Sequence, residues 1–280
     1  MSTVETDIAQ NKGWHAHLYL EYTLRDKRTV LSRNRHHGPL VVQRPLYPEG
    51  GVCHTCILHP PGGVVGGDRL EINILAKEDT ATLITTPGAT KFYRSAGNKA
   101  VQEQHIRVDD GAILEWFPQD NILFPGANAE INTRVDLAPT AQFIGWEILC
   151  LGMPVNGEVF NSGQLATSFI IHRHESPLFI DRLRVNSEKD LNRCAGLHGF
   201  PVTATFVATG CNPEMLDSLR NLAPHEQEAL YGVTLMEELL VARYLGRSTF
   251  AAQALFTRIW KYLRPEIIKK DACPPRIWAT

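Results

Sequence analysis

Three carboxylates lie in surroundings where an isolated charge is costly. Glu115 and Glu147 are each flanked by apolar and aromatic residues, and Asp68 closes a glycine-rich turn. A buried carboxylate is unfavourable unless it is paired, hydrated or bound to a metal. Two roles are therefore open, namely ion pairing inside the fold or the lining of a wet polar passage. The arginines that we consider for the pairing are Arg44, Arg69 and Arg94.

Cys53 and Cys56 form a Cys-x-x-Cys motif, the spacing with which many zinc sites begin. The sequence contains no second pair of this kind, and the apolar flanking residues predict a strand. Side chains three residues apart on a strand point to opposite faces, so the two sulfurs should diverge. We interpret both cysteines as small buried side chains. A transient soft-metal contact through His54 and Cys56 is the alternative.

His172 and His174 are a second candidate metal pair. On a strand they would share one face, a spacing that suits nickel or zinc, but the sequence shows no identifiable third ligand. Solvated surface histidines are the simpler interpretation.

Motifs for common enzyme chemistry are missing from the sequence. It contains no P-loop, no Gly-x-Ser-x-Gly elbow and no His-Glu-x-x-His helix. These three kinds of active site are therefore not expected; that the protein is not an enzyme is a prediction that rests on the family resemblance given below. A hydrolase that uses Asp68 with His59 is the rival interpretation, and a β-rich interaction module without a metal path is a third.

Residues 59–69 combine two prolines with two glycine pairs, followed by Asp68 and Arg69. The prolines stiffen the entry, and the glycines permit backbone angles that are closed to other residues. The spacing does not fit a dinucleotide-binding turn, because the following residues alternate as in a strand. We predict a close-packed structural turn. Its glycines are Gly62, Gly63, Gly66 and Gly67.

Alternating apolar and polar residues predict many short strands without intervening helices. This pattern favours a mainly β fold, with many short strands in a helically wound or layered sheet arrangement and a few C-terminal helices. The predicted strands cover residues 18–24, 70–75, 81–85, 100–108, 112–117, 130–137, 142–149, 166–172 and 178–185.

Helix signals are confined to the last third of the chain. Asn212 can cap a short helix that begins with Pro213. Ser248 can cap a longer helix to about Leu263, where Pro265 should stop it. We favour a strand for the ambiguous residues 233–244. The stripe predicted for the longer helix is Ala251, Leu255, Ile259 and Tyr262.

The composition is that of an ordinary globular protein, with 44% hydrophobic and 21% charged residues. A formal net charge of -2 gives no bulk attraction to nucleic acid or anionic membranes, so we expect neither as a partner. No apolar run is long enough for a membrane helix, and residues 1–12 lack the features of a secretory signal. We predict a cytoplasmic protein with a flexible N-terminal tail, residues 1–13, and a single domain, residues 14–280.

The glycine-rich turn resembles the signature turn of the UreD (UreH) family of urease accessory proteins. Five further blocks resemble motifs of that family in the same order, and the block that contains Lys91 and Arg94 is nearly identical to one of them. The last block resembles the family's ending, so we expect the chain to be complete. The five blocks are residues 44–50, 85–95, 115–124, 145–152 and 275–280.

The resemblance implies a non-enzymatic metallochaperone scaffold. Such a protein would bind apo-urease together with UreF and UreG and assist nickel insertion into the urease active site. UreG would supply GTP hydrolysis, since this chain has no P-loop. The resemblance implies Ni²⁺ in transit and no tightly bound cofactor, and it leaves a dimer within the accessory complex open.

Members of this family are thought to carry a water-filled internal channel for nickel. Asp68, Glu115 and Glu147 lie inside the matched blocks, so the resemblance makes them candidates for lining such a channel. Carboxylates and water hold Ni²⁺ more weakly than imidazole or thiolate, and weak, repeated binding suits a cation that must move on. The remaining motif residues are predicted to be structural: Gly62, Gly63, Gly66, Gly67, Arg69, Lys91 and Arg94.

Overall fold

The computed structural model describes residues 13–186, 188–222, 224 and 227–279. The predicted N-terminal tail therefore lies outside the described residues, except for Gly13. Gly13 packs so closely on the glycine-rich turn that a Cβ at this position would lie 2.0 Å from the carbonyl carbon of Gly67.

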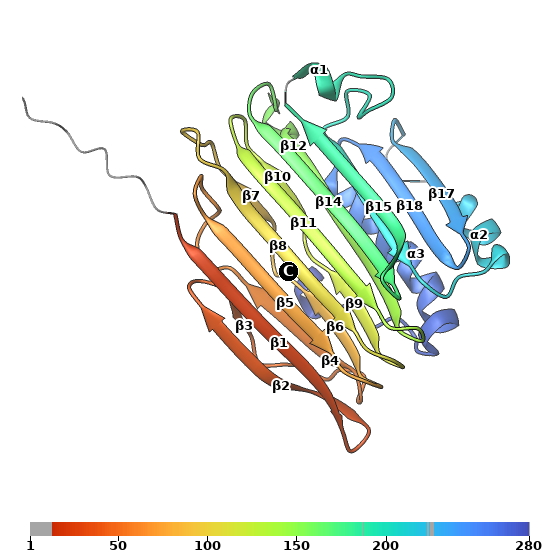
Figure 1. Ribbon diagram of the computed structural model, residues 1–280. Helices are drawn as coiled ribbons and strands as arrows, with labels where there is room; N and C mark the ends of the chain where they lie inside the picture. Colours follow the sequence, from red (N-terminus) through yellow and green to blue (C-terminus); the bar gives the residue numbers. More distant parts are fainter. Residues whose placement is uncertain (1–12, 187, 223, 225–226, 280) are drawn as a thin grey trace, which may run out of the picture.

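Two β-sheets face one another across a common core (Figure 1). The seven-stranded sheet has the order β15-β14-β11-β8-β5-β1-β2. It comprises β1 (His15–Arg25), β2 (Arg28–His37), β5 (Arg69–Ala76), β8 (Ala100–Val108), β11 (Asn128–Leu137), β14 (Gln164–Arg173) and β15 (Ser176–Val185).

The eleven-stranded sheet has the main order β17-β18-β16-β12-β9-β6-β4-β3, and three short strands join it at the side. It comprises β3 (Val41–Val42), β4 (Cys53–Leu58), β6 (Ala81–Thr85), β7 (Thr90–Phe92), β9 (Ile113–Phe117), β10 (Asn121–Leu123), β12 (Gln142–Met153), β13 (Glu158–Val159), β16 (Val202–Ala208), β17 (Leu230–Met236) and β18 (Leu239–Gly246).

The helical elements are few. They are α1 (Glu188–Leu191), α2 (Pro213–Arg220) and α3 (Thr249–Ile268), with the short 3-10 turns η1 (Pro154–Asn156) and η2 (Arg276–Ala279). None of the helices in the described part of the chain is both long enough and apolar enough to cross a membrane.

The chain winds as a coil between the two sheets. From β5 to β14 it passes alternately through the seven-stranded and the eleven-stranded sheet. Five of the strands laid down in this way, β8, β9, β11, β12 and β14, pair in parallel with the strand laid down one coil earlier. Antiparallel strands such as β2 and β15 flank this parallel centre. The predicted mainly β fold with helically wound strands and a C-terminal helix is confirmed.

Strand alternation explains why two sheets can share one core. On β5, Leu70, Ile72 and Ile74 are buried between the sheets, whereas Glu71 and Asn73 face outward. The predicted ranges 81–85 and 100–108 coincide with β6 and β8. A second core lies between the eleven-stranded sheet and α3.

The caps of the two predicted helices are confirmed. The side chain of Asn212 accepts a hydrogen bond from the backbone N–H of Met215, and that of Ser248 accepts one from Ala251. The predicted stop at Pro265 is wrong, because α3 continues to Ile268. A proline removes only one donor, and the buried side chains of Arg264 and Ile268 hold the last turn in place.

Two other details of the C-terminal third also differ from the predictions. Tyr262 is 40% exposed, and the buried stripe of α3 continues from Ile259 to Leu263 instead. Residues 233–244 are strand-forming, as predicted, but they belong to two strands, β17 and β18, that form a hairpin. Its turn contains Glu237 at φ 54°, a position where glycine or asparagine would have signalled the turn.

Candidate functional site

Three of the singled-out sequence blocks meet at one end of the molecule. The backbone N–H of Val64, in the glycine-rich turn, donates to the carbonyl of Lys91, and Tyr93 N–H donates to the carbonyl of Val64. Thr90 N–H donates to the carbonyl of Asp120, which follows β9. Backbone hydrogen bonds thus join the glycine-rich turn, residues 90–93 and Asp120, which are separate in sequence. We call these joined segments the rim.

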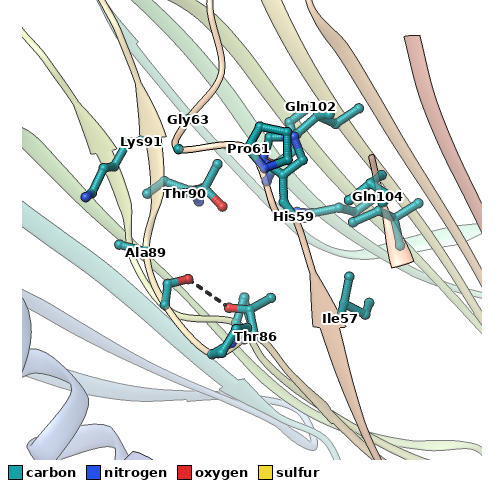
Figure 2. A pocket seen from close by; sticks show the side chains of 18 of the residues that line it. Ile57, His59, Pro61, Gly63, Thr86, Ala89, Thr90, Lys91, Gln102 and Gln104 are labelled. Atoms are coloured by element: carbon teal, nitrogen blue, oxygen red, sulfur yellow. Dashed lines mark hydrogen bonds between the residues drawn. The ribbon is translucent and has the colours of Figure 1, made fainter. Parts of the chain in front are cut away.

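This rim borders a first cavity, of about 150 Å³, between the two sheets. Figure 2 shows side chains from the turn, the 86–91 segment and β8 around it, with Lys91 at the rim. Gln102 and Gln104 are each 4% exposed and line its inner wall, and none of the described lining residues is acidic. Burial lowers the pKa of His59 in this lining, which favours the neutral ring near pH 7. The cavity therefore combines apolar and uncharged polar side chains on its inner wall and is roomy enough for several water molecules.

The two glycines at the rim give a matched test of the turn. A Cβ at Gly63 would lie 2.3 Å from a ring carbon of Tyr93 and 2.7 Å from the Lys91 carbonyl oxygen, whereas a Cβ at Gly62 would meet nothing within 4 Å. We expect Gly63→Ala to lower the free energy of unfolding by about 1–3 kcal/mol, because the turn must shift. Gly62→Ala should change it by less than about 0.5 kcal/mol. Urea denaturation of both variants measures the difference, and equal effects would contradict the tight fit at Gly63.

Polar side chains continue from the first cavity into the space between the sheets. Thr133 on β11 is the in-register neighbour of Gln104 on β8, and both side chains are buried. The Thr133 hydroxyl contacts the Gln104 side-chain oxygen and Oε1 of Glu147, which lies on β12 of the opposite sheet. This chain of contacts joins the two sheets through polar atoms.

Beyond Glu147 lies a second cavity, of about 270 Å³. On the eleven-stranded sheet, Glu147, Thr205 and Arg243 are successive cross-strand neighbours on β12, β16 and β18. Asp181 on β15 faces them from the seven-stranded sheet and binds Arg243 Nη1 at 2.7 Å. We call these residues the polar row: Gln104, Thr133, Glu147, Thr205, Asp181 and Arg243.

Glu147 is the carboxylate most strongly affected by this location. Burial raises its pKa from 4.5 to about 7; the hydrogen bond from Thr133 opposes this rise, and the negative charge of Asp181 adds to it. A hydroxyl has one proton and cannot donate to two acceptors at once. A protonated Glu147 that donates to Thr133, while Thr133 donates to Gln104, satisfies both contacts.

The raised pKa predicts a pH dependence of stability. Between pH 4.5 and 7 the folded protein keeps a proton on Glu147 that the unfolded chain releases. The contribution of Glu147 to stability must therefore fall as pH rises through this window. Compared with Glu147→Gln, the wild-type chain should lose about 3 kcal/mol of unfolding free energy between pH 4.5 and 8. Urea denaturation of both proteins at the two pH values tests this, and a constant difference would contradict it.

Asp68 does not lie on the polar row. Its two carboxylate oxygens accept hydrogen bonds from the backbone N–H groups of Trp14 and Val65, at 2.8 and 2.9 Å. These bonds close the glycine-rich turn and tie it to the start of β1. Asp68 is therefore best described as a structural residue, since each of its carboxylate oxygens already accepts a backbone hydrogen bond.

Glu115 is buried on the other side of the eleven-stranded sheet, facing α3. It accepts hydrogen bonds from Arg264, at 3.0 to 3.2 Å, and from the indole N–H of Trp260. Arg264 also binds Glu49, and Glu49 binds His54 at 2.6 Å. Burial alone would raise the pKa of Glu49, but the hydrogen bonds from His54 and Arg264 lower it to about 2. Glu115 is thus half of a buried ion pair.

The partners proposed for the acids from sequence are wrong. Among the described residues, Arg44, Arg69 and Arg94 bind none of the three carboxylates. Arg69 pairs with Glu103 on the outer face of the seven-stranded sheet, and the stem of Arg94 packs on Gly126. The arginine that binds Glu115 lies 149 residues away on α3. Sequence spacing carries no information about such a contact.

Cys53 and Cys56 diverge, as predicted from their spacing on a strand. Cys53 packs in the core between the sheets, whereas Cys56 lines a different pocket together with His54, the residue predicted to share its face. The predicted shared face of His172 and His174 is wrong, because β14 ends at Arg173 and His174 lies in the following turn at φ 51°. Within the described parts of the chain, no three His, Cys, Asp or Glu side chains are placed to hold one metal ion.

Most of the polar row was not predicted from the sequence, although the sequence contains a signal for it. In the predicted strand 100–108, Gln102 and Gln104 occupy the same face as Ala100, Ile106 and Val108. Polar side chains on an otherwise apolar strand face indicate a buried polar site. Thr133, between Ile131 and Val135, gives the same signal on β11.

Comparison with known proteins gives one consistent result. Residues 15–279 match the family described as "UreD urease accessory protein". The chain is 48% identical to a protein of Alcanivorax borkumensis named urease accessory protein UreD, over 97% of this chain and 94% of that protein. Proteins of the same name from Pseudomonas putida and Aliivibrio fischeri are 44% and 40% identical, over 96% of this chain and 95% and 98% of theirs.

Proposed function

Since the chain belongs to the UreD family of urease accessory proteins, and therefore has a role in urease maturation, we propose that it assists nickel insertion by passing Ni²⁺ through its interior. The observation that supports this proposal is the polar row. It connects a first cavity at the glycine-rich rim with a second cavity beyond Glu147, through the space between two otherwise apolar sheet faces.

The chemistry of the two cavities suits a hydrated cation in transit. Besides apolar side chains and Lys91 at the rim, the described lining of the first cavity offers amides and hydroxyls, which can bind the water shell of an ion without holding the metal itself. Glu147 would then be the first carboxylate along the row, and Asp181 the second. Oxygen ligands hold Ni²⁺ more weakly than imidazole or thiolate, so each step can release the ion to the next.

The structure alters which acids we propose for this path. Glu147 remains a candidate for transient contact with nickel. Asp68 and Glu115 are better explained by the bonds that they already make, to backbone N–H groups and to Arg264. We propose Asp181, Gln104 and Thr133 in their place.

Within this proposal the chain is a scaffold and not an enzyme. It would act in the cytoplasm on apo-urease, together with UreF and UreG, and UreG would supply GTP hydrolysis. Nickel is the cargo of this protein, and no cofactor would remain bound to it.

The experiment that tests the function is the deletion of this chain from cells that express the urease genes. Urease is then purified, and its nickel content and activity are measured with and without a plasmid-borne copy. We expect nickel-poor, inactive urease that is restored by the copy. Fully nickel-loaded urease in the deletion strain would refute the proposal. Co-purification of a tagged chain with urease subunits, UreF and UreG tests the proposed partners.

A further inference from the structure

The second cavity lies where the seven-stranded sheet ends, and Asp181 and Arg243 are part of its lining. β15 is the edge strand of that sheet, whereas the eleven-stranded sheet continues through β16 and β18 to β17 (Figure 1). Asp181 on β15 contacts Thr205 on β16 and Arg243 on β18, so these strands face β15 across the gap. At this edge only side chains, together with residues 195–197, which also line the cavity, separate the space between the sheets from solvent.

One ion pair spans the gap at this edge. Arg243 Nη1 lies 2.7 Å from Asp181 Oδ2, and the side chains of Arg243 and Asp181 are 52% and 27% exposed. The Thr205 hydroxyl donates to the same Asp181 oxygen at 3.1 Å, and the Arg243 guanidinium lies 5.8 Å from the centre of the Phe179 ring. Arg243 is thus held against Asp181 and Phe179 of the opposite sheet. Counted from Gln104, the ion pair lies farther along the polar row than Glu147.

We propose that the Arg243–Asp181 ion pair is a latch that closes the second cavity, and that a small cation can reach Glu147 from this side only when the pair opens. While the pair is closed, a fixed positive charge at the mouth opposes the entry of a cation, and Asp181 is occupied by Arg243. Opening the pair removes the obstruction and frees a carboxylate at the mouth. A partly exposed ion pair contributes little stability, so it can be broken at small cost.

This inference rests on the proposed function for its biological meaning, but it can be tested without nickel or urease. Thr167 on β14 lines the second cavity and is replaced by cysteine, in a full-length chain whose exposed Cys194 is changed to serine. The rate at which residue 167 reacts is followed by peptide mass spectrometry. The probes are a cationic reagent, 2-aminoethyl methanethiosulfonate, and its anionic 2-sulfonatoethyl counterpart.

We expect Arg243→Ala and Asp181→Asn each to raise the labelling rate by about fivefold, the factor that an exposed ion pair can contribute. The gain in Arg243→Ala should be larger for the cationic reagent. Arg243→Lys, which can keep an ion pair, should stay close to the parent. Arg182 lines the same cavity and makes no ion pair in the described structure, so Arg182→Ala is the matched control and should change nothing.

Unchanged labelling in both Arg243→Ala and Asp181→Asn would overturn the latch, as would an equal increase in Arg182→Ala. Asp181→Asn keeps the size of the side chain, so it remains informative if Arg243→Ala does not fold, and thermal unfolding identifies a variant that has lost its structure. A failed latch leaves the deletion experiment above unaffected. The two proposals can therefore fail separately.

Discussion

Replacement of Arg264 by methionine should lower the free energy of unfolding by about 3–5 kcal/mol, the largest loss that we expect from one substitution in this chain. Arg264 is fully buried and binds two carboxylates, Glu115 and Glu49, together with the carbonyl of Asp271. Burial already raises the pKa of Glu115, and without Arg264 this carboxyl would have to stay charged with no cation beside it or take up a proton on folding. The loss of stability arises from this unpaired acid. Replacing both partners of a buried ion pair by well-packed apolar residues changes stability little, whereas removing one partner leaves the other buried without compensation.

Urea denaturation measures this loss, and two further variants define its cause. Lys261→Met changes an exposed cation of the same helix and should shift stability by less than about 0.5 kcal/mol. Adding Glu115→Gln to Arg264→Met should recover part of the loss, since the buried charge is then absent. If the double variant is less stable than the sum of the two single effects predicts, our account of the ion pair is wrong.

Replacement of Glu147 by glutamine should reduce the nickel content of urease in cells by on the order of tenfold, comparable to the loss of one partner at a metal site. The neutral amide keeps the size of the side chain and can still contact Thr133, but it cannot offer a charged oxygen to a cation. Stability should not fall. Ionised Glu147 is unfavourable above pH 7, so the variant should be at least as stable as the wild-type chain there.

A loss of nickel loading without a loss of stability distinguishes a conduit from a plain scaffold. Glu130→Gln is a suitable control, because Glu130 lies on β11 like Thr133 but on the outer face, where it pairs with Lys99. We expect this control to load urease normally. Normal loading by Glu147→Gln would exclude the interior path through this residue, while leaving a role in urease maturation intact.

The two acids illustrate why burial alone does not identify a functional carboxylate. Glu115 and Glu147 are both buried on neighbouring strands of one sheet, and their flanking sequences are alike. Their side chains face opposite sides of that sheet, Glu115 toward the helix and Glu147 toward the other sheet. The partner on each side decides the role, since Arg264 neutralises Glu115 whereas Thr133 leaves Glu147 open to a cavity.

What the sequence by itself determined is the local structure and the family. Strand positions follow from the alternation of side chains, which is a property of a few consecutive residues, and β6 and β8 begin and end where this pattern does. The caps of α2 and α3 are local in the same sense. The ordered motif blocks were sufficient to indicate the UreD family before any contact was known.

The tertiary structure alone decided which residues form the candidate site. The polar row depends on the register between strands and on the facing of two sheets, with contacts between residues up to 62 positions apart, and Arg264 reaches Glu115 over 149 positions. Such contacts arise from the packing of the coil as a whole. A residue's type and near neighbours cannot specify them, because the same alternation is compatible with many registers.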